Sequence, residues 1–441
     1  MLLKFHYLCL DKVYEPNLDM EFRRLRNNNT LPNARETSNA IHSTNDEKED
    51  AREFSLFLMQ FSQFLDHDLT LTPQTPSCLS GCQATEAGDN VCCDQFNAFH
   101  ANPENFPNYT RSSECWPIPV KNGDPYFSKE NGGPTCLEFK RSVKVECDVA
   151  LRNIDDDDLS EFNELTHFLD LSSVYGSDEE TATELRALSK GLLRLNQFQD
   201  DKLPFELNRC AGEDMVPPIT HPLQFHAGDV RANENPGLQS VHTVWVKEHN
   251  RIAEEIYKKF PDKTDEELFQ EARKYLIAVW QHITYDEWLP MVIGEKAILD
   301  LGLSNIKRSE YDPTQRPTIF QEFSTAAFRF GHGLIRSLIQ MYELPPDAVA
   351  QSRSTKVKPN FNGDINLSDQ FFNTTLIQEK RINELMTGMT VQGSKSFGPK
   401  IANAVRLQLF RMEDKAFGND LGKKNLQKNC LNVKCYIFCN Y

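Results

Sequence analysis

The sequence lacks several features that would place it in a common class of protein. It has no run of about 18 apolar residues, so no membrane-spanning helix is expected. Lys and Arg (48) are outnumbered by Asp and Glu (64), and the net charge of −16 disfavours nucleic acid or an anionic membrane as a partner. No repeat, low-complexity tract or Pro/Ser/Gly-rich linker divides the 441 residues. The sequence therefore predicts one large domain rather than a string of small ones.

Strand signals are also scarce. Alternating β-branched positions are few, whereas the long segments between Asp-, Pro- and Gly-bearing loops have apolar residues at a spacing near 3.6. We therefore predict a mainly α protein with little β structure.

The cysteines do not form a recognisable metal site. There are twelve, but no C-x-x-C pair is present, which favours disulfides over zinc and implies an oxidising compartment. Sequons at Asn28, Asn108, Asn366 and Asn373 agree with secretion. The first ten residues, MLLKFHYLCL, make a poor signal peptide. We expect a secreted protein whose natural start lies upstream.

One very apolar segment carries three polar side chains. Residues 54–69, FSLFLMQFSQFLDHDL, would be buried almost all round as a helix. Gln63, Asp66 and His67 stand at i, i+3 and i+4, so an amide, a carboxyl and an imidazole would share one interior face. Burial of polar side chains is costly, so their presence in such a helix indicates a specific role.

A second segment, 322–338 (EFSTAAFRFGHGLIRSL), also has helical apolar spacing. Its apolar residues in register are Phe323, Ala327, Phe330, Leu334 and Leu338. His332 lies between two glycines, each of which costs a helix roughly 1 kcal/mol relative to alanine. Such a pair suggests that something flat and large approaches the backbone, and a porphyrin bound through the imidazole would fit.

These strings occur in order with LPNAR (31–35), DLSSVYGS (170–177), RANE (231–234) and RFGHGLI (329–335). Together they resemble the animal haem peroxidase superfamily, which includes leukocyte, milk, thyroid and arthropod chorion-type enzymes. The resemblance implies a single, mainly helical domain over about residues 19–428, with haem between a distal and a proximal helix. From the resemblance we expect residues 429–441 to be a divergent tail in place of the last part of the family's domain.

On the distal side, the resemblance assigns the peroxide chemistry to three residues. A neutral imidazole is suited to move the peroxide proton between its two oxygens, and His67 is the candidate. A fixed guanidinium, that of Arg231, would stabilise the charge that builds on the leaving oxygen. Gln63 would hold water or a small anion. The carboxyls of Asp66 and Glu234 would be esterified to methyl groups of haem b.

On the proximal side, the resemblance makes His332 the ligand of the haem iron. The partner of its other ring nitrogen would be Asn425, in DLGKKNLQ (420–427). Arg329, three residues before His332, would pair with a haem propionate.

A calcium ion is the second cofactor that the resemblance implies. Oxygen ligands suit this hard cation, and THFLDLS offers Thr166, the Phe168 carbonyl, Asp170 and Ser172 at every second residue of an extended or looped backbone. Asp68 would complete the set and tie this loop to the distal helix.

Two departures from the family bear on function. The chloride-oxidising leukocyte enzyme has methionine directly after the RANE-type glutamate, whereas Asn235 stands here, so chloride is a poor candidate donor. Cys210 lacks the neighbouring cysteine that the family commonly has, so it could form an intermolecular disulfide.

The leading interpretation is a secreted haem peroxidase that uses hydrogen peroxide to oxidise small reductants such as phenols, iodide, bromide or thiocyanate. The alternative is a peroxidase-derived adhesion or interaction protein with little or no catalysis. A zinc hydrolase, suggested by His242 and His249, is disfavoured because seven residues separate them. They are expected to be core and surface-facing helix residues.

Overall fold

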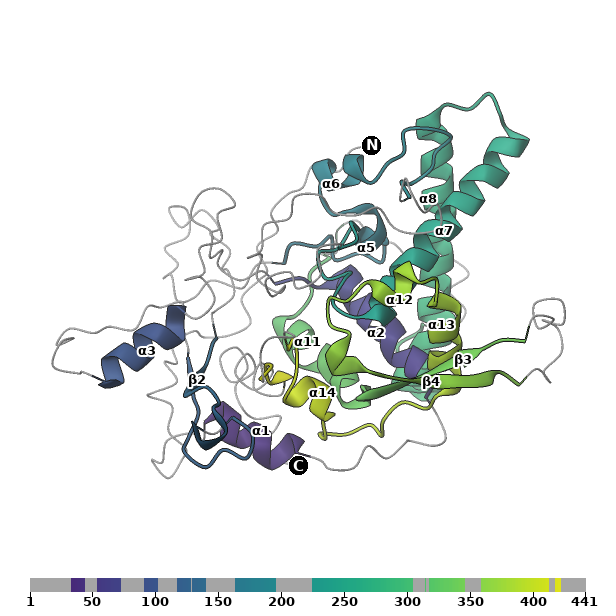
Figure 1. The fold of residues 1–441 in the computed structure, drawn as a ribbon. Coiled ribbons are helices and arrows are strands. Elements are labelled where there is room, and N and C mark those ends of the chain that lie inside the picture. The colour runs from purple at the N-terminus through teal and green to yellow at the C-terminus, as the bar shows by residue number, and fades with distance from the viewer. Residues whose placement is uncertain are drawn as a thin grey trace, which may run out of the picture.

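The computed structural model describes residues 33–43, 54–72, 91–101, 117–127, 129–139, 163–195, 224–303, 314, 317–345, 358–411 and 417–421. Helices dominate these residues, and the strands form two small antiparallel sheets (Figure 1). The expectation of a mainly α fold is confirmed. The longer helices are α1 (Ala34–His42), α2 (Leu56–Leu69), α3 (Val91–Ala101), α7 (Pro236–Lys259), α8 (Asp265–His282) and α13 (Ile382–Val391).

Short elements connect these helices. The short α-helices are α5 (Ser172–Tyr175), α6 (Glu179–Glu184), α9 (Leu289–Ile293), α10 (Glu295–Asp300), α11 (Gln321–Thr325), α12 (Thr375–Gln378) and α14 (Asn403–Arg406). A π-helix, η4 (Ile283–Trp288), and three 3₁₀ helices, η2 (Lys129–Asn131), η5 (Ala327–Leu334) and η6 (Leu367–Asp369), are interspersed with them. The strands are β1 (Ile118–Pro119), β2 (Cys136–Leu137), β3 (Leu338–Glu343) and β4 (Asn360–Asn366).

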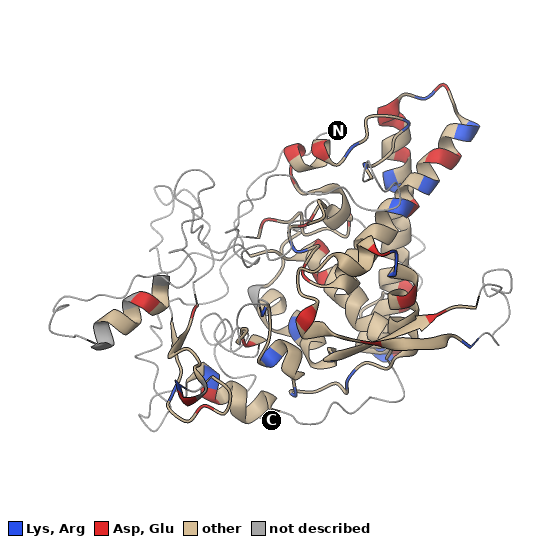
Figure 2. Cartoon of the chain, in the orientation of Figure 1, with Lys and Arg blue, Asp and Glu red and all other residues tan. Residues whose placement is uncertain are grey.

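The long helices α7 and α8 form an antiparallel pair (Figure 1). Asn235 caps the start of α7, and Pro236 at its first position has the backbone angle that a helix needs. At the start of α8, the side chain of Thr264 accepts from the backbone of Glu267, whose carboxylate accepts in return from the Thr264 backbone. The buried rings of Trp245 and Trp280 meet edge to face at 5.4 Å between the two helices. Charged residues gather at the end of the pair where the chain reverses (Figure 2).

Helix α2 lies in the centre of the main core and contacts α5, α7, α13 and η5. Its bounds agree with the helix predicted from the apolar segment 54–69. Phe64 and Leu65 are fully buried, and Phe64 packs edge to face on Trp280. On another side, the Trp288 indole donates a 2.8 Å hydrogen bond to Ser62 Oγ. Because α2 is surrounded in this way, the polar side chains that it carries are held in fixed positions.

A second, smaller core lies around α1, β1 and β2. The buried guanidinium of Arg35 donates to both oxygens of Asp124, at 2.8 and 3.0 Å, and to Asp420 at 2.6 Å. Segments almost 400 residues apart are therefore joined by one cation. A disulfide between Cys93 and Cys136 attaches α3 to this core, which agrees with the expected disulfide chemistry.

The segment 322–338 is not the single α-helix that its spacing predicted. It divides into α11, the 3₁₀ helix η5 and the first residue of β3. Phe323 and Leu338 are 37% and 50% exposed, so the predicted apolar register is also wrong. Two glycines within three residues weaken an α-helix, and Ile335 is already extended. The periodicity indicated helical structure in this segment, but it did not indicate where one element ends and the next begins.

No helix in the described part of the chain is long and apolar enough to cross a membrane.

Candidate active site

One cavity collects the predicted distal and proximal residues. Its open space, including the part that opens to solvent, is about 1530 Å³. It is lined by Gln63, Asp66, His67, Arg231, Glu234, Arg329 and His332, together with leucine, isoleucine and phenylalanine side chains. These seven residues come from α2, from the turn before α7 and from η5. The structure therefore brings together residues that are up to 269 positions apart in the sequence.

His67 is held as a neutral imidazole on one wall of the cavity. Only 3% of the residue is exposed, and burial lowers the pKa of His67 well below its usual value, with the charge of Arg231 adding to the shift. Its Nδ1 is enclosed by protein, makes no hydrogen bond and lies 3.8 Å from Asp229 Oδ1. Nε2 is the nitrogen left to face the cavity. A neutral imidazole in this position can accept a proton from a ligand.

Arg231 is fixed by Asp229, a residue that the sequence analysis did not single out. Arg231 donates to Asp229 through Nε at 2.9 Å and through Nη2 at 2.7 Å, and its Nη1 donates to the Thr70 carbonyl at 2.8 Å. Burial alone would raise the pKa of Asp229, but the charge and hydrogen bonds of Arg231 hold it far below its usual range. The pair is ionised and its guanidinium is immobile.

The acidic side chain of Asp66 pairs with Arg329 across the cavity. Asp66 Oδ2 accepts from Arg329 Nη1, and Asp66 Oδ1 accepts from Thr70 Oγ1 at 2.7 Å. Arg329 is thus placed against a carboxylate of the protein, whereas the sequence had suggested a haem propionate as its partner. Its Nε also donates to the Ser324 carbonyl at 2.7 Å, so the guanidinium is anchored on its own segment.

His332 lies on η5 and lines the same cavity as His67. Its residue surface stays partly accessible because it borders the cavity, yet protein surrounds the ring closely enough that burial lowers the pKa of His332 to about 3. The nearby charge of Arg329 contributes to that shift. His332 is therefore neutral at physiological pH, which is the form that binds a metal ion.

The two glycines beside His332 have different roles. A Cβ at Gly331 would meet nothing within 4 Å, and Gly331 lines the cavity. A Cβ at Gly333 would lie 2.4 Å from the Gly398 carbonyl oxygen. Gly331 therefore leaves open space beside the backbone, whereas Gly333 is required by the packing of the chain on itself.

Two of the predicted calcium ligands, Asp170 and Ser172, lie close to Asp68. Ser172 Oγ lies 3.3 Å from Asp68 Oδ1, and Asp170 Oδ1 accepts from the Ser172 backbone at 3.0 Å. The loop is not evenly extended, because His167 and Leu171 have positive φ and Ser172 begins α5. Burial, together with the negative charge of Asp170, raises the pKa of Asp68 to about 7. The buried carboxylate of Asp68, the half-buried carboxylate of Asp170 and the Ser172 hydroxyl supply oxygen atoms of the kind that calcium prefers.

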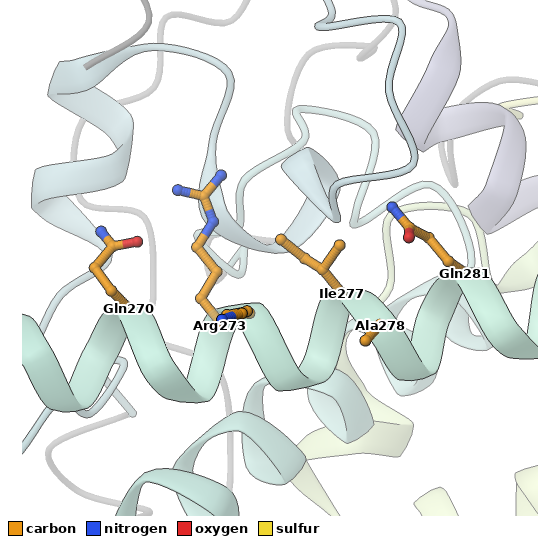
Figure 3. Close-up of a pocket in the computed structure, with 6 residues that line it drawn as sticks. Gln270, Arg273, Ile277, Ala278 and Gln281 are labelled. Carbon is orange, nitrogen blue, oxygen red and sulfur yellow. The ribbon is translucent and has the colours of Figure 1, made fainter. Parts of the chain in front are cut away.

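Trp280 supports this set from the core. Its indole donates to Asp68 Oδ2 at 2.8 Å. A separate pocket lies along α8 on the side that faces the segment 163–195, and it is lined by Gln270, Arg273, Ile277, Ala278 and Gln281 among others (Figure 3). It contains none of the predicted site residues.

The histidines of α7 do not form a metal site. His242 and His249 are both fully buried, so the expected surface position of one of them is wrong. His249 Nε2 lies 2.9 Å from the Gly191 carbonyl oxygen, and its Nδ1 lies 2.8 Å from Tyr175 Oη. Among the residues that the structure describes, no group of three His, Cys, Asp or Glu side chains could hold a metal ion.

Two predicted residues lie outside the described residues. These are Asn425, the expected partner of His332, and Cys210, the expected unpaired cysteine. Conversely, Asp229 and the amide of Gln60 belong to the site but were missed. A signal for Asp229 existed, because an acidic residue two positions before Arg231 in a tight turn can reach the arginine side chain.

Comparison with known proteins identifies the family to which the chain is related. The family model described as animal haem peroxidase matches residues 6–429. The chain is 32% identical over 410 residues to a chorion peroxidase of Aedes aegypti, covering 91% of this chain and 46% of that protein. It is 34% identical over 359 residues to a human peroxidasin homolog, covering 78% and 22%. The chain thus spans less than half of these relatives.

Solved structures show the same fold. Peroxidase A from Dictyostelium discoideum superposes with a TM-score of 0.68 at 23% identity, over 97% of this chain and 72% of that one. A fatty acid alpha-dioxygenase from Oryza sativa superposes with a TM-score of 0.63 at 16% identity, over 91% and 60%. Since the family model covers nearly the whole sequence, this chain belongs to the animal haem peroxidase family.

Proposed function

We propose that this chain is a secreted haem peroxidase that uses hydrogen peroxide to oxidise small reductants. The observation that carries the proposal is the single cavity that has neutral His67 and fixed Arg231 on one wall and neutral His332 on another. This is the minimum set for peroxide cleavage, namely a proton carrier, a fixed positive charge and an iron ligand.

The cavity fits haem b in its chemistry. Apolar side chains line much of it, Gly331 leaves open space beside His332, and Asp66 and Glu234 present carboxyls to the same space. His332 would bind the iron, and Arg329 would exchange part of its contact with Asp66 for a propionate. Asp66 and Glu234 are the candidates for ester bonds. Asn425 stays the proposed partner of His332. Bound haem would supply the redox chemistry, and the protein the proton transfer and the electrostatics.

The roles of the distal residues follow from their contacts. The cavity-facing nitrogen of His67 would accept a proton from hydrogen peroxide and return it to the oxygen that leaves. Arg231 stabilises the negative charge on that oxygen without rearranging, because Asp229 already fixes its guanidinium. Gln63 offers its amide to water or to an anion.

Calcium is proposed at Asp68, Thr166, the Phe168 carbonyl, Asp170 and Ser172. A divalent cation would neutralise the two carboxylates, whose pKa values are raised by burial. Since Asp68 directly follows His67 on α2, the ion would also stabilise the position of the catalytic imidazole.

The reductants that the enzyme oxidises are proposed from their chemistry alone. Phenols, iodide, bromide and thiocyanate are candidates. Chloride is disfavoured, because Asn235 stands where a thioether link to haem would need methionine. An intermolecular disulfide through Cys210 is part of the proposal for partners, and the chorion peroxidase and peroxidasin relatives support an extracellular location.

The test is rapid mixing of haem-loaded protein with hydrogen peroxide. His67→Ala should slow the first spectral change by orders of magnitude while the haem stays bound, because only the proton carrier is lost. An unchanged rate would refute the role of His67. If the haem-loaded wild-type protein did not react with peroxide at all, the interpretation as an adhesion protein would replace this one.

A further inference from the structure

Three side-chain amides form a connected cluster on the distal wall of the cavity. Gln60, Gln63 and Asn235 all line it. Asn235 Nδ2 donates to Gln63 Oε1 at 3.1 Å, and Gln60 Nε2 donates to the same oxygen at 3.2 Å. The carbonyl end of Gln63 therefore receives two hydrogen bonds from the protein.

The orientation of Asn235 is fixed by helix capping. Its Oδ1 accepts from the backbone N–H of Leu238 at 3.0 Å, as the N-cap of α7. The first N–H groups of a helix need an acceptor, so the oxygen of Asn235 must face the helix and its NH₂ group must face Gln63. The usual ambiguity between the two ends of an amide is thereby removed.

Gln60 is oriented by the same helix end. A Cβ at Gly237 would lie 2.2 Å from Gln60 Oε1, so glycine is needed to let that oxygen approach the start of α7. The positive end of the helix dipole favours an oxygen there. The NH₂ group of Gln60 is consequently turned toward Gln63.

Two fixed donors determine the direction of the Gln63 amide. Its oxygen faces the wall, so its Nε2 is the end that faces the cavity. In the described part of the chain, no acceptor is seen for this NH₂ group. The nearby charges balance in number, with three cationic side chains against three carboxylates: Arg231, Arg329 and Arg336 against Asp229, Asp66 and Glu234. An anion in the cavity therefore depends on such oriented N–H donors.

We propose that Asn235 is a positioning residue that keeps the N–H donor of the Gln63 amide turned toward the cavity, where the proposed function places small anions of the halide or thiocyanate type. This inference rests on the proposed function and names the residue that orients Gln63. Neutral phenols would not need the N–H group of Gln63 in order to bind.

The test is a titration of haem-loaded protein with thiocyanate, followed by the shift of the haem absorption band. Asn235→Asp keeps the oxygen that caps α7 but offers Gln63 an acceptor in place of a donor, so only Gln60 still holds the Gln63 oxygen and the new carboxylate draws the Gln63 NH₂ group away from the cavity. We expect the dissociation constant for thiocyanate to rise at least about tenfold, as for the loss of one hydrogen bond to a charged group.

The added negative charge is separated by a double-mutant cycle. In a Gln63→Ala background, Asn235→Asp retains only the effect of its charge, so its effect there should be several times smaller than in the wild-type protein. Equal effects in both backgrounds would overturn the proposal. A second variant, Gln63→Met, removes the N–H donor at similar side-chain size and adds no charge. It should weaken thiocyanate binding to a similar degree, and unchanged binding would also overturn the proposal.

The two proposals fail in different ways. Wild-type protein without a haem absorption band would refute the proposed function and this inference together. Protein that binds haem and reacts with peroxide, but whose spectrum does not respond to thiocyanate, would refute only the anion site.

Discussion

Asp229 is predicted to be essential because it fixes Arg231. Asp229→Asn keeps the size of the side chain and removes its charge. Both partners are almost completely buried, with exposed side-chain fractions of 4% for Arg231 and 0% for Asp229. Loss of one partner of such a pair costs about 3 to 5 kcal/mol, because the other charge remains buried. The free energy of unfolding should therefore fall by about 4 kcal/mol.

This loss of stability can be measured as a fall in the unfolding midpoint. The unfolding entropy is roughly 2.1 cal/mol/K per residue, so over 441 residues the fall is roughly 4 °C.

The same substitution should impair the peroxide reaction. A guanidinium that is no longer held by two charged hydrogen bonds stabilises the leaving oxygen less well. The rate of the first peroxide step should fall at least about tenfold, and stopped-flow absorbance measures it.

A surface pair provides the matched control. Asp300 is 62% exposed and pairs with Lys296 on α10, so Asp300→Asn should cost less than about 1 kcal/mol and leave the peroxide rate unchanged. If Asp229→Asn behaved like this control in both measurements, the argument that Asp229 holds the catalytic arginine would be refuted.

Three further predictions follow from the packing, the calcium set and a buried histidine. Gly333→Ala should lower the urea midpoint more than Gly331→Ala, because the new methyl group would lie 2.4 Å from the Gly398 oxygen at the first position and in open space at the second; equal midpoints would contradict this. A calcium chelator should lower the melting temperature of the wild-type protein but not of Asp68→Asn, and an insensitive wild-type protein would argue against the ion. Burial holds the pKa of His249 at about 4, below its unfolded value of 6.5, so the unfolded chain binds the proton first and stability falls by up to roughly 3 kcal/mol as pH drops from 6.5 to 4. His249→Asn should flatten that decline in urea midpoints, and parallel curves would show that His249 does not cause it.

The sequence predicted α2 and its polar face well because both signals are local. Gln63, Asp66 and His67 share a face through helical spacing alone, and the apolar residues between them require burial. Bringing Arg231 and His332 to the same cavity is not a local property. Only the family resemblance suggested that distant segments meet there.

Other features depended on contacts that periodicity does not contain. The segment 322–338 broke into three elements because Gly333 packs on Gly398 and Leu338 pairs with Asn366 in a sheet. Arg329 contacts Asp66, a partner 263 positions away, and spacing could not indicate it. The role of Asn235 depends on which end of an amide faces a helix, which becomes evident only in three dimensions.

The most direct test of the account is the absorption and electron paramagnetic resonance spectra of the protein loaded with haem, recorded for the wild type and for His332→Ala. The account predicts a histidine-bound ferric haem in the wild type and loss of that signal in the variant, with partial recovery when imidazole is added. Identical spectra of the two proteins would contradict it, because the iron would then be bound by another residue or by none.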